Sequence, residues 1–73
     1  MSLVELTEMI IKWTNKYSGE TGYVASVSRK EGHFINTYNR EEAKDYSAKT
    51  VSKIVDDLIA FGEGEENVFE VIE

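Results

Sequence analysis

The chain must hold its fold together without a covalent crosslink, because none of its 73 residues is a cysteine and only one is a histidine. A domain of this size buries only about 60% of the surface that its unfolded chain exposes, so its core is small. Small domains usually supplement such a core with a disulfide, a metal or a partner subunit. Composition nearly excludes the first two. We therefore expect association, and a homodimer is the commonest form.

The charge balance disfavours some classes of function. Asp and Glu outnumber Lys and Arg by 14 to 8, which gives a net charge of −6. Binding to phosphate backbones depends on basic side chains, so a general nucleic-acid-coating protein is not expected. No apolar run reaches the roughly 18–20 residues of a membrane span, and no secretory signal is recognisable. Together with the absence of cysteine, these features predict a cytoplasmic protein with no membrane partner.

Two segments have the apolar spacing of amphipathic helices. In the first, apolar side chains recur at steps of three and four residues, which predicts a helix at about residues 3–17. In the second, Asn39 has the position of a helix N-cap and Gly62 that of a helix terminator. The apolar stripe between them predicts a helix at about residues 40–61.

Other segments favour β structure. The stretches "YVASVS" and "HFINTY" alternate and predict strands at about residues 23–29 and 33–38. Between them, residues 30–32 suit a three-residue hairpin loop closed by a glycine, which places Arg29 opposite His33. A last short strand is predicted at residues 68–72.

The order α-β-β-α-β predicts a single α+β domain over residues 1–73. The last strand fits best beside the first strand and antiparallel to it. The predicted fold is thus a three-stranded, mostly antiparallel sheet of order 2-1-3 packed against two helices.

No catalytic pattern is recognisable. His33 is the single candidate for a general base or a metal ligand, and it lies at the predicted hairpin tip, where an ordinary surface histidine is the commoner interpretation. The serines lack a glycine-framed nucleophile elbow, and the glycines form no phosphate-binding loop. We expect no enzyme activity, no metal and no cofactor.

An apolar sheet face is predicted to remain uncovered once two helices pack on the other side. Contiguous exposed patches of this kind usually mark interfaces. Either the first helix or another chain would have to cover this sheet face, and we expect another chain. The predicted interface residues are Val24, Phe34, Tyr38, Val68 and Ile72.

Acidic residues gather around the predicted C-terminal end of the second helix. A helix C-terminus carries partial negative charge and favours cations, so carboxylates are locally unfavourable there. A basic protein partner would relieve the repulsion, although solvation alone also accounts for it. This acidic patch consists of Asp56, Asp57, Glu63, Glu65 and Glu66.

The sequence therefore predicts a small cytosolic protein-interaction module that self-associates through its apolar sheet face. The alternative is a nucleic-acid-binding regulator that uses the hairpin region, although acidic residues interleave with its basic ones. The nucleic-acid contacts in that case would be Arg29, Lys30, Asn36 and Arg40.

Overall fold

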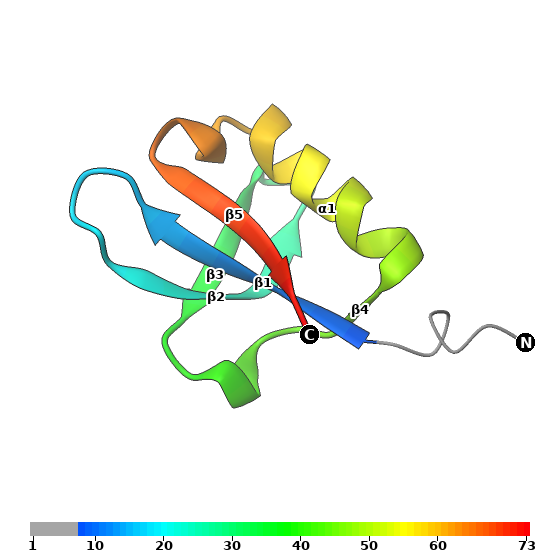
Figure 1. The fold of residues 1–73 in the computed structure, drawn as a ribbon. Helices are drawn as coiled ribbons and strands as arrows, with labels where there is room; N and C mark the ends of the chain where they lie inside the picture. Colours follow the sequence, from blue (N-terminus) through cyan, green and yellow to red (C-terminus); the bar gives the residue numbers. More distant parts are fainter. Residues whose placement is uncertain (1–7) are drawn as a thin grey trace, which may run out of the picture.

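The computed structural model describes residues 8–73, which form a small α+β fold with one α-helix and a curled antiparallel sheet (Figure 1). In chain order the elements are β1 (Glu8–Asn15), β2 (Thr21–Ser28), β3 (His33–Thr37), the 3-10 turn η2 (Arg40–Glu42), β4 (Tyr46–Ser47), α1 (Ala48–Ala60), the 3-10 turn η3 (Glu63–Glu65) and β5 (Asn67–Ile72). Strands β3, β2, β1 and β5 follow one another across the sheet, and the short β4 pairs with the start of β1.

β1 is the central strand, because it has a partner along both edges. On one edge it pairs with β5 from Ile10 to Asn15. On the other edge its second half pairs with β2, with Trp13 opposite Gly22. Ile10 and Ile11 point to opposite faces of the sheet, and both are buried.

The prediction of a helix at about residues 3–17 is wrong for the residues that the structure describes. Residues 8–15 form β1, and residues 3–7 lie outside the described part of the chain. A strand that is covered on both faces carries apolar residues at adjacent positions, and such a run also fits steps of three and four. Spacing alone therefore did not distinguish the two structures.

The helix predicted at about residues 40–61 begins later, at Ala48. Asn39 caps the turn η2 instead, where its Oδ1 accepts a backbone N–H at 2.9 Å. The N-cap of α1 is Ser47, whose hydroxyl oxygen accepts a backbone N–H of the first turn at 3.2 Å. The predicted end is confirmed, since Gly62 follows the helix with a positive φ of 92°.

The predicted sheet of order 2-1-3 packed against two helices is also wrong. Its three strands are present as β2, β3 and β5, but β1 lies between β2 and β5. The prediction paired β2 directly with β5. In the structure the first segment is itself a strand, β1, and it lies between these two. Within residues 8–73, a single α-helix packs on this larger sheet.

The hairpin between β2 and β3 has a four-residue loop, residues 29–32, rather than three. Ser28 therefore lies opposite His33, and the predicted pairing of Arg29 with His33 is wrong. A shift of one residue turns side chains to the other face of a strand. As a result, Phe34 packs against the core instead of facing away from it.

The sheet curls strongly. A β-bulge between Val24 and Ser26 brings Val24 to the same inward face as Val27. Phe34 of β3 and Phe69 of β5 meet edge to face with ring centroids 5.6 Å apart, although β2 and β1 separate their strands in the sheet. In a flat sheet three strand spacings would amount to about 14 Å, so this contact requires the curl.

α1 packs on the inward face of the curled sheet, beside β5 (Figure 1). The core is a small cluster of buried apolar side chains. Burying one Val, Leu or Ile side chain fully contributes about 1.5–3 kcal/mol to the free energy of unfolding. An ion pair of 3.0 Å between Arg29 Nε and Asp57 Oδ2 joins the β2–β3 loop to α1. The buried cluster consists of Ile11, Trp13, Val24, Val51, Ile54 and Leu58.

Within the described residues, no helix combines the length and the apolar character needed to cross a membrane.

Gly22 lets the indole ring of Trp13 lie directly against β2. A Cβ atom at Gly22 would stand 2.5 Å from Trp13 Cζ2 and 2.9 Å from the backbone oxygen of Thr37. The ring cannot easily withdraw, because Trp13 is 4% exposed and its Nε1–H donates a hydrogen bond to the Tyr23 carbonyl at 3.1 Å. The absence of a side chain at this position is therefore a packing requirement.

We expect Gly22→Ala to lower the free energy of unfolding by about 1–3 kcal/mol, the usual cost of overpacking a core. Urea denaturation measures the change. Gly64→Ala is the matched control, since its added Cβ would meet Ile59 at an ordinary 3.5 Å. Equal stability of the two variants would contradict this account of the Trp13 contact.

Candidate functional site

β5 is an edge strand. Among the described residues it pairs with β1 and with no other strand. Alternate residues of an edge strand direct their N–H and C=O groups away from the sheet, where another extended chain can pair with them. The outer edge of β5 is therefore a potential pairing site.

A groove of about 560 Å³ runs beside the beginning of β5. Two apolar side chains beside it are largely exposed, Ile59 of α1 at 56% and Val68 of β5 at 53%. Its rim carries charges of both signs. The groove is lined by Lys16, Ile59, Gly64, Glu65, Asn67, Val68 and Phe69.

Two hydrogen bonds from Lys16 hold η3 at the end of the groove. The Nζ atom donates to the Gly64 carbonyl at 2.7 Å, and the backbone N–H donates to the Glu66 carbonyl at 2.8 Å. Farther along β5, Val71 lies opposite the fully buried Ile11 and yet is 38% exposed. α1 therefore leaves this side of β5 partly uncovered.

The five predicted interface residues do not share one surface. Val24 is fully buried in the core, and Phe34 packs inward against Phe69. Val68 is exposed and lies on the opposite face of the sheet, since it is paired with Thr14 rather than with an inward residue. Tyr38 follows the end of β3 and is exposed, and Ile72 is half-buried opposite Ile10.

The predicted acidic patch is only partly a free surface. Asp57 is engaged with Arg29, and its Oδ2 atom is buried. Glu63 is half-buried, whereas Asp56, Glu65 and Glu66 are exposed. The exposed members lie around the C-terminal end of α1 and the turn η3.

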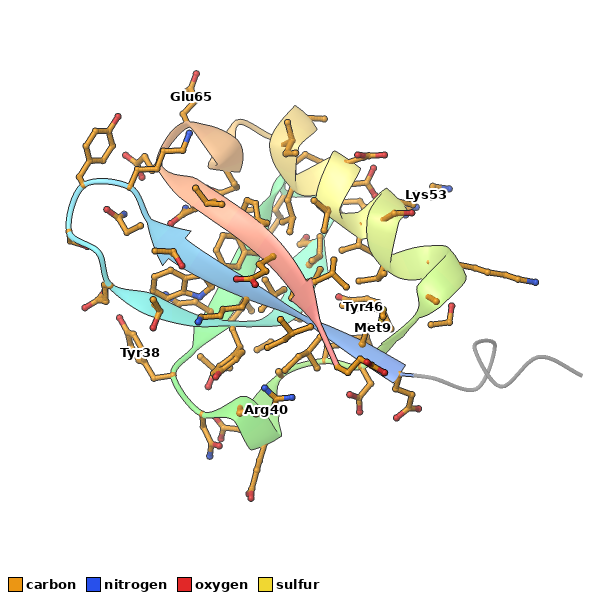
Figure 2. The ribbon with its side chains drawn as sticks, viewed as in Figure 1. Met9, Tyr38, Arg40, Tyr46, Lys53 and Glu65 are labelled. Carbon is orange, nitrogen blue, oxygen red and sulfur yellow. The ribbon has the colours of Figure 1, made fainter. Side chains whose placement is uncertain are left out.

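The four predicted nucleic-acid contacts are not brought together. Arg29 pairs with Asp57, and the guanidinium of Arg40 donates to the backbone oxygen of Glu73. Figure 2 shows Arg40 at the opposite end of β5 from Glu65 on η3. Lys30 is exposed in the β2–β3 loop, and Asn36 lies at the far end of β3.

His33 lies at the surface next to the hairpin loop. Its Nε2 is 3.4 Å from Glu31 Oε1. Within residues 8–73, no three His, Cys, Asp or Glu side chains are placed to hold a metal ion.

The groove was not predicted from the sequence, because β1, against which β5 packs, was expected to be a helix. One signal was available. Leu58 and Ile59 are adjacent apolar residues on a helix, and their side chains point about 100° apart. One of them is therefore expected nearer the edge of the apolar stripe, and Ile59 is the one left exposed.

Comparison with protein-family models, with curated proteins and with solved structures finds no match for the chain. Function therefore has to be inferred from the surfaces themselves.

Tyr38 and Glu20 link the end of β3 to the β1–β2 loop. The Tyr38 hydroxyl donates to Glu20 Oε1 at 2.9 Å. Loss of the phenolic proton would break this hydrogen bond and place two negative charges side by side, so the pKa of Tyr38 is raised above its ordinary value of 10.0, chiefly by the hydrogen bond. The folded chain thus holds this proton more tightly than the unfolded chain, and the stabilisation is lost as pH rises through the folded-state pKa.

We expect Glu20→Gln to lower the pKa of Tyr38 toward its ordinary value, because a neutral amide accepts the phenolic proton in a weaker hydrogen bond than a carboxylate does and no longer repels the phenolate. Ring chemical shifts recorded against pH by NMR measure the change. Tyr46 is the internal control, since burial alone raises its pKa and that pKa should not move. An unchanged Tyr38 titration would show that Glu20 is not the cause.

Proposed function

We propose that the chain is a small protein-interaction module that binds an extended segment of a partner protein along the outer edge of β5. The observation that carries the proposal is the groove of about 560 Å³ beside this edge, with Ile59 and Val68 exposed next to its opening. Strand addition of this kind uses main-chain hydrogen bonds for affinity and side-chain pockets for specificity.

The position of α1 favours a peptide segment over a folded domain. α1 lies next to β5 (Figure 1), and the groove is bounded by its residue Ile59 on one side and by Val68 and Phe69 on the other. A single extended chain fits between a strand edge and a helix, with one apolar side chain directed into the groove.

Charge favours a partner segment with basic residues. Glu65, Glu66 and Glu70 are exposed on η3 and β5, and the chain as a whole has a net charge of −6. Lys16 also lines the groove, but its ammonium group is engaged with the Gly64 carbonyl. Complementary charges of this kind mainly raise association rates and set partner choice.

The homodimer stays a prediction, and the sheet face on which it relied is not present as one surface. Light scattering over a range of concentrations tests the dimer, because it distinguishes the monomer mass of 8.3 kDa from twice that value.

Selection of peptides from a random display library on the immobilised chain tests the proposed function. We expect the recovered peptides to shift the NMR amide resonances of residues 67–72 more than those of β2. Val68→Lys should weaken their binding about tenfold or more, because it replaces an apolar contact worth about 1.5 kcal/mol with a charge. Ser52→Lys, on the exposed side of α1, adds the same charge away from the groove and should have little effect.

The proposed function is wrong if no peptide is enriched. It is equally wrong if the enriched peptides shift resonances away from β5, or if both lysine variants weaken binding to the same extent. Circular dichroism of each variant checks that the fold is retained.

A further inference from the structure

A second cavity, of about 380 Å³, opens beyond the C-terminal end of α1. Its walls come from β1, the β1–β2 loop, β3, η3 and the first residue of β5, and one of its lining residues, Phe34, is in contact with Phe69 of β5. Its volume is in the lower part of the range of about 300–1,000 Å³ that is usual for small-molecule sites. It is lined by Trp13, Asn15, Glu20, Phe34, Ile35, Asn36, Glu63 and Asn67.

The lining of this cavity has negative charge without compensating positive charge. Two of the lining residues are carboxylates, Glu20 and Glu63, and none is Lys, Arg or His. Neither carboxylate takes part in an ion pair within residues 8–73. The nearby Lys16 lines the neighbouring groove instead and donates to the Gly64 carbonyl. A cationic ligand would therefore meet two uncompensated carboxylates.

Hydrogen bonds within the chain hold several of these polar groups and leave acceptors unused. Glu20 receives the Tyr38 hydroxyl on Oε1, and its Oε2 has no hydrogen bond within residues 8–73. Asn67 donates its amide nitrogen to the Glu63 carbonyl at 3.3 Å, and its Oδ1 has no hydrogen bond within the same residues. The Asn36 side chain adds a further amide at the exposed end of β3. These acceptors match a ligand that has several N–H donors.

Aromatic rings complete the lining. Trp13 is fixed by its hydrogen bond to the Tyr23 carbonyl and by its close approach to Gly22. Phe34 is held by its edge-to-face contact with Phe69. Trp13 is only 4% exposed, so the half-buried Phe34 is the ring against which the alkyl part of a ligand can pack. Ligands with phosphate groups would instead be repelled by Glu20 and Glu63.

We infer that this cavity binds a small organic cation with N–H donors, an alkylguanidinium or an alkylammonium group. The carboxylates of Glu20 and Glu63 supply charge-assisted hydrogen bonds, the asparagine amides supply further acceptors, and the half-buried Phe34 contacts the alkyl part beside the small exposed part of Trp13. The group can belong to a free amine or to a basic side chain of another protein. The cavity and the β5 groove are two openings that have one lining residue in common, Asn67.

Titration of the full chain with agmatine tests the inference. Trp13 is the single tryptophan and lines the cavity, so its fluorescence reports binding directly. We expect a saturable change. A blocked Gly-Arg-Gly tripeptide is titrated in parallel, because tighter binding of the tripeptide indicates a protein side chain as the natural ligand, and tighter binding of agmatine indicates a free amine.

Two isosteric variants separate a specific site from general attraction to an acidic protein. Glu63→Gln removes one charge from the cavity and should weaken agmatine binding about fivefold or more. Glu65→Gln removes the same charge from the same turn, but Glu65 lines the other groove, so the affinity should change less than about twofold. Matching circular dichroism spectra and melting temperatures confirm that both variants fold.

The inference is overturned if neither probe saturates below about 10 mM, or if the two glutamine variants weaken binding equally. Loss of peptide binding in Val68→Lys with agmatine binding intact would show that the two sites are independent. The inference about the cation site can thus be disproved without affecting the proposed function. The proposed function can likewise be disproved without affecting the cation site.

Discussion

The packing of Trp13 in the central strand is the interaction on which the rest of the structure depends. Its ring lies against Gly22 on one neighbouring strand, and its backbone is paired with Phe69 on the other. The indole N–H is bound to the Tyr23 carbonyl, so a large side chain is buried without an unsatisfied donor. This arrangement joins β2, β1 and β5 around one rigid group and gives a small chain a core without a crosslink.

Curling of the sheet lets a single helix close that core. The bulge after Val24 turns β2 inward, and Phe34 and Phe69 from the two outer strands meet. A flat four-stranded sheet would need helices along its whole face, whereas the curled sheet leaves a space that α1 largely fills with Val51, Ile54 and Leu58. The apolar surface that suggested a partner subunit is partly hidden by this geometry, since Val24 and Phe34 turn inward.

Features that depend on neighbouring residues were predicted from the sequence better than the pairing of strands that lie far apart in the chain. The glycine that ends α1 and the strands on either side of the β2–β3 loop were recognisable, because their signals lie within a few residues. β1 was not recognisable, since adjacent apolar residues such as Ile10 and Ile11 fit a helix as well as a strand covered on both faces. The loop length was wrong by one residue, and that error alone moved Phe34 from core to predicted interface. The adjacent Leu58 and Ile59 indicated an exposed apolar residue on the helix, but the position of the groove could not be predicted, because it exists only where β5 has β1 as its neighbour.

Both candidate sites have a common structural origin in the length of α1. The helix stops at Ala60, and Gly62 then reverses the chain into η3 before β5 begins. A longer helix would cover the end of the curled sheet, but here η3 occupies that region with Glu65 lining the groove and Glu63 lining the cavity. Two of the acidic residues that follow the helix C-terminus, where carboxylates are unfavourable for the helix dipole, therefore line two openings of different chemistry. The groove has exposed apolar side chains beside a strand edge, and the cavity has carboxylates without an ion-pair partner within residues 8–73, so the two proposed sites would select ligands of different kinds.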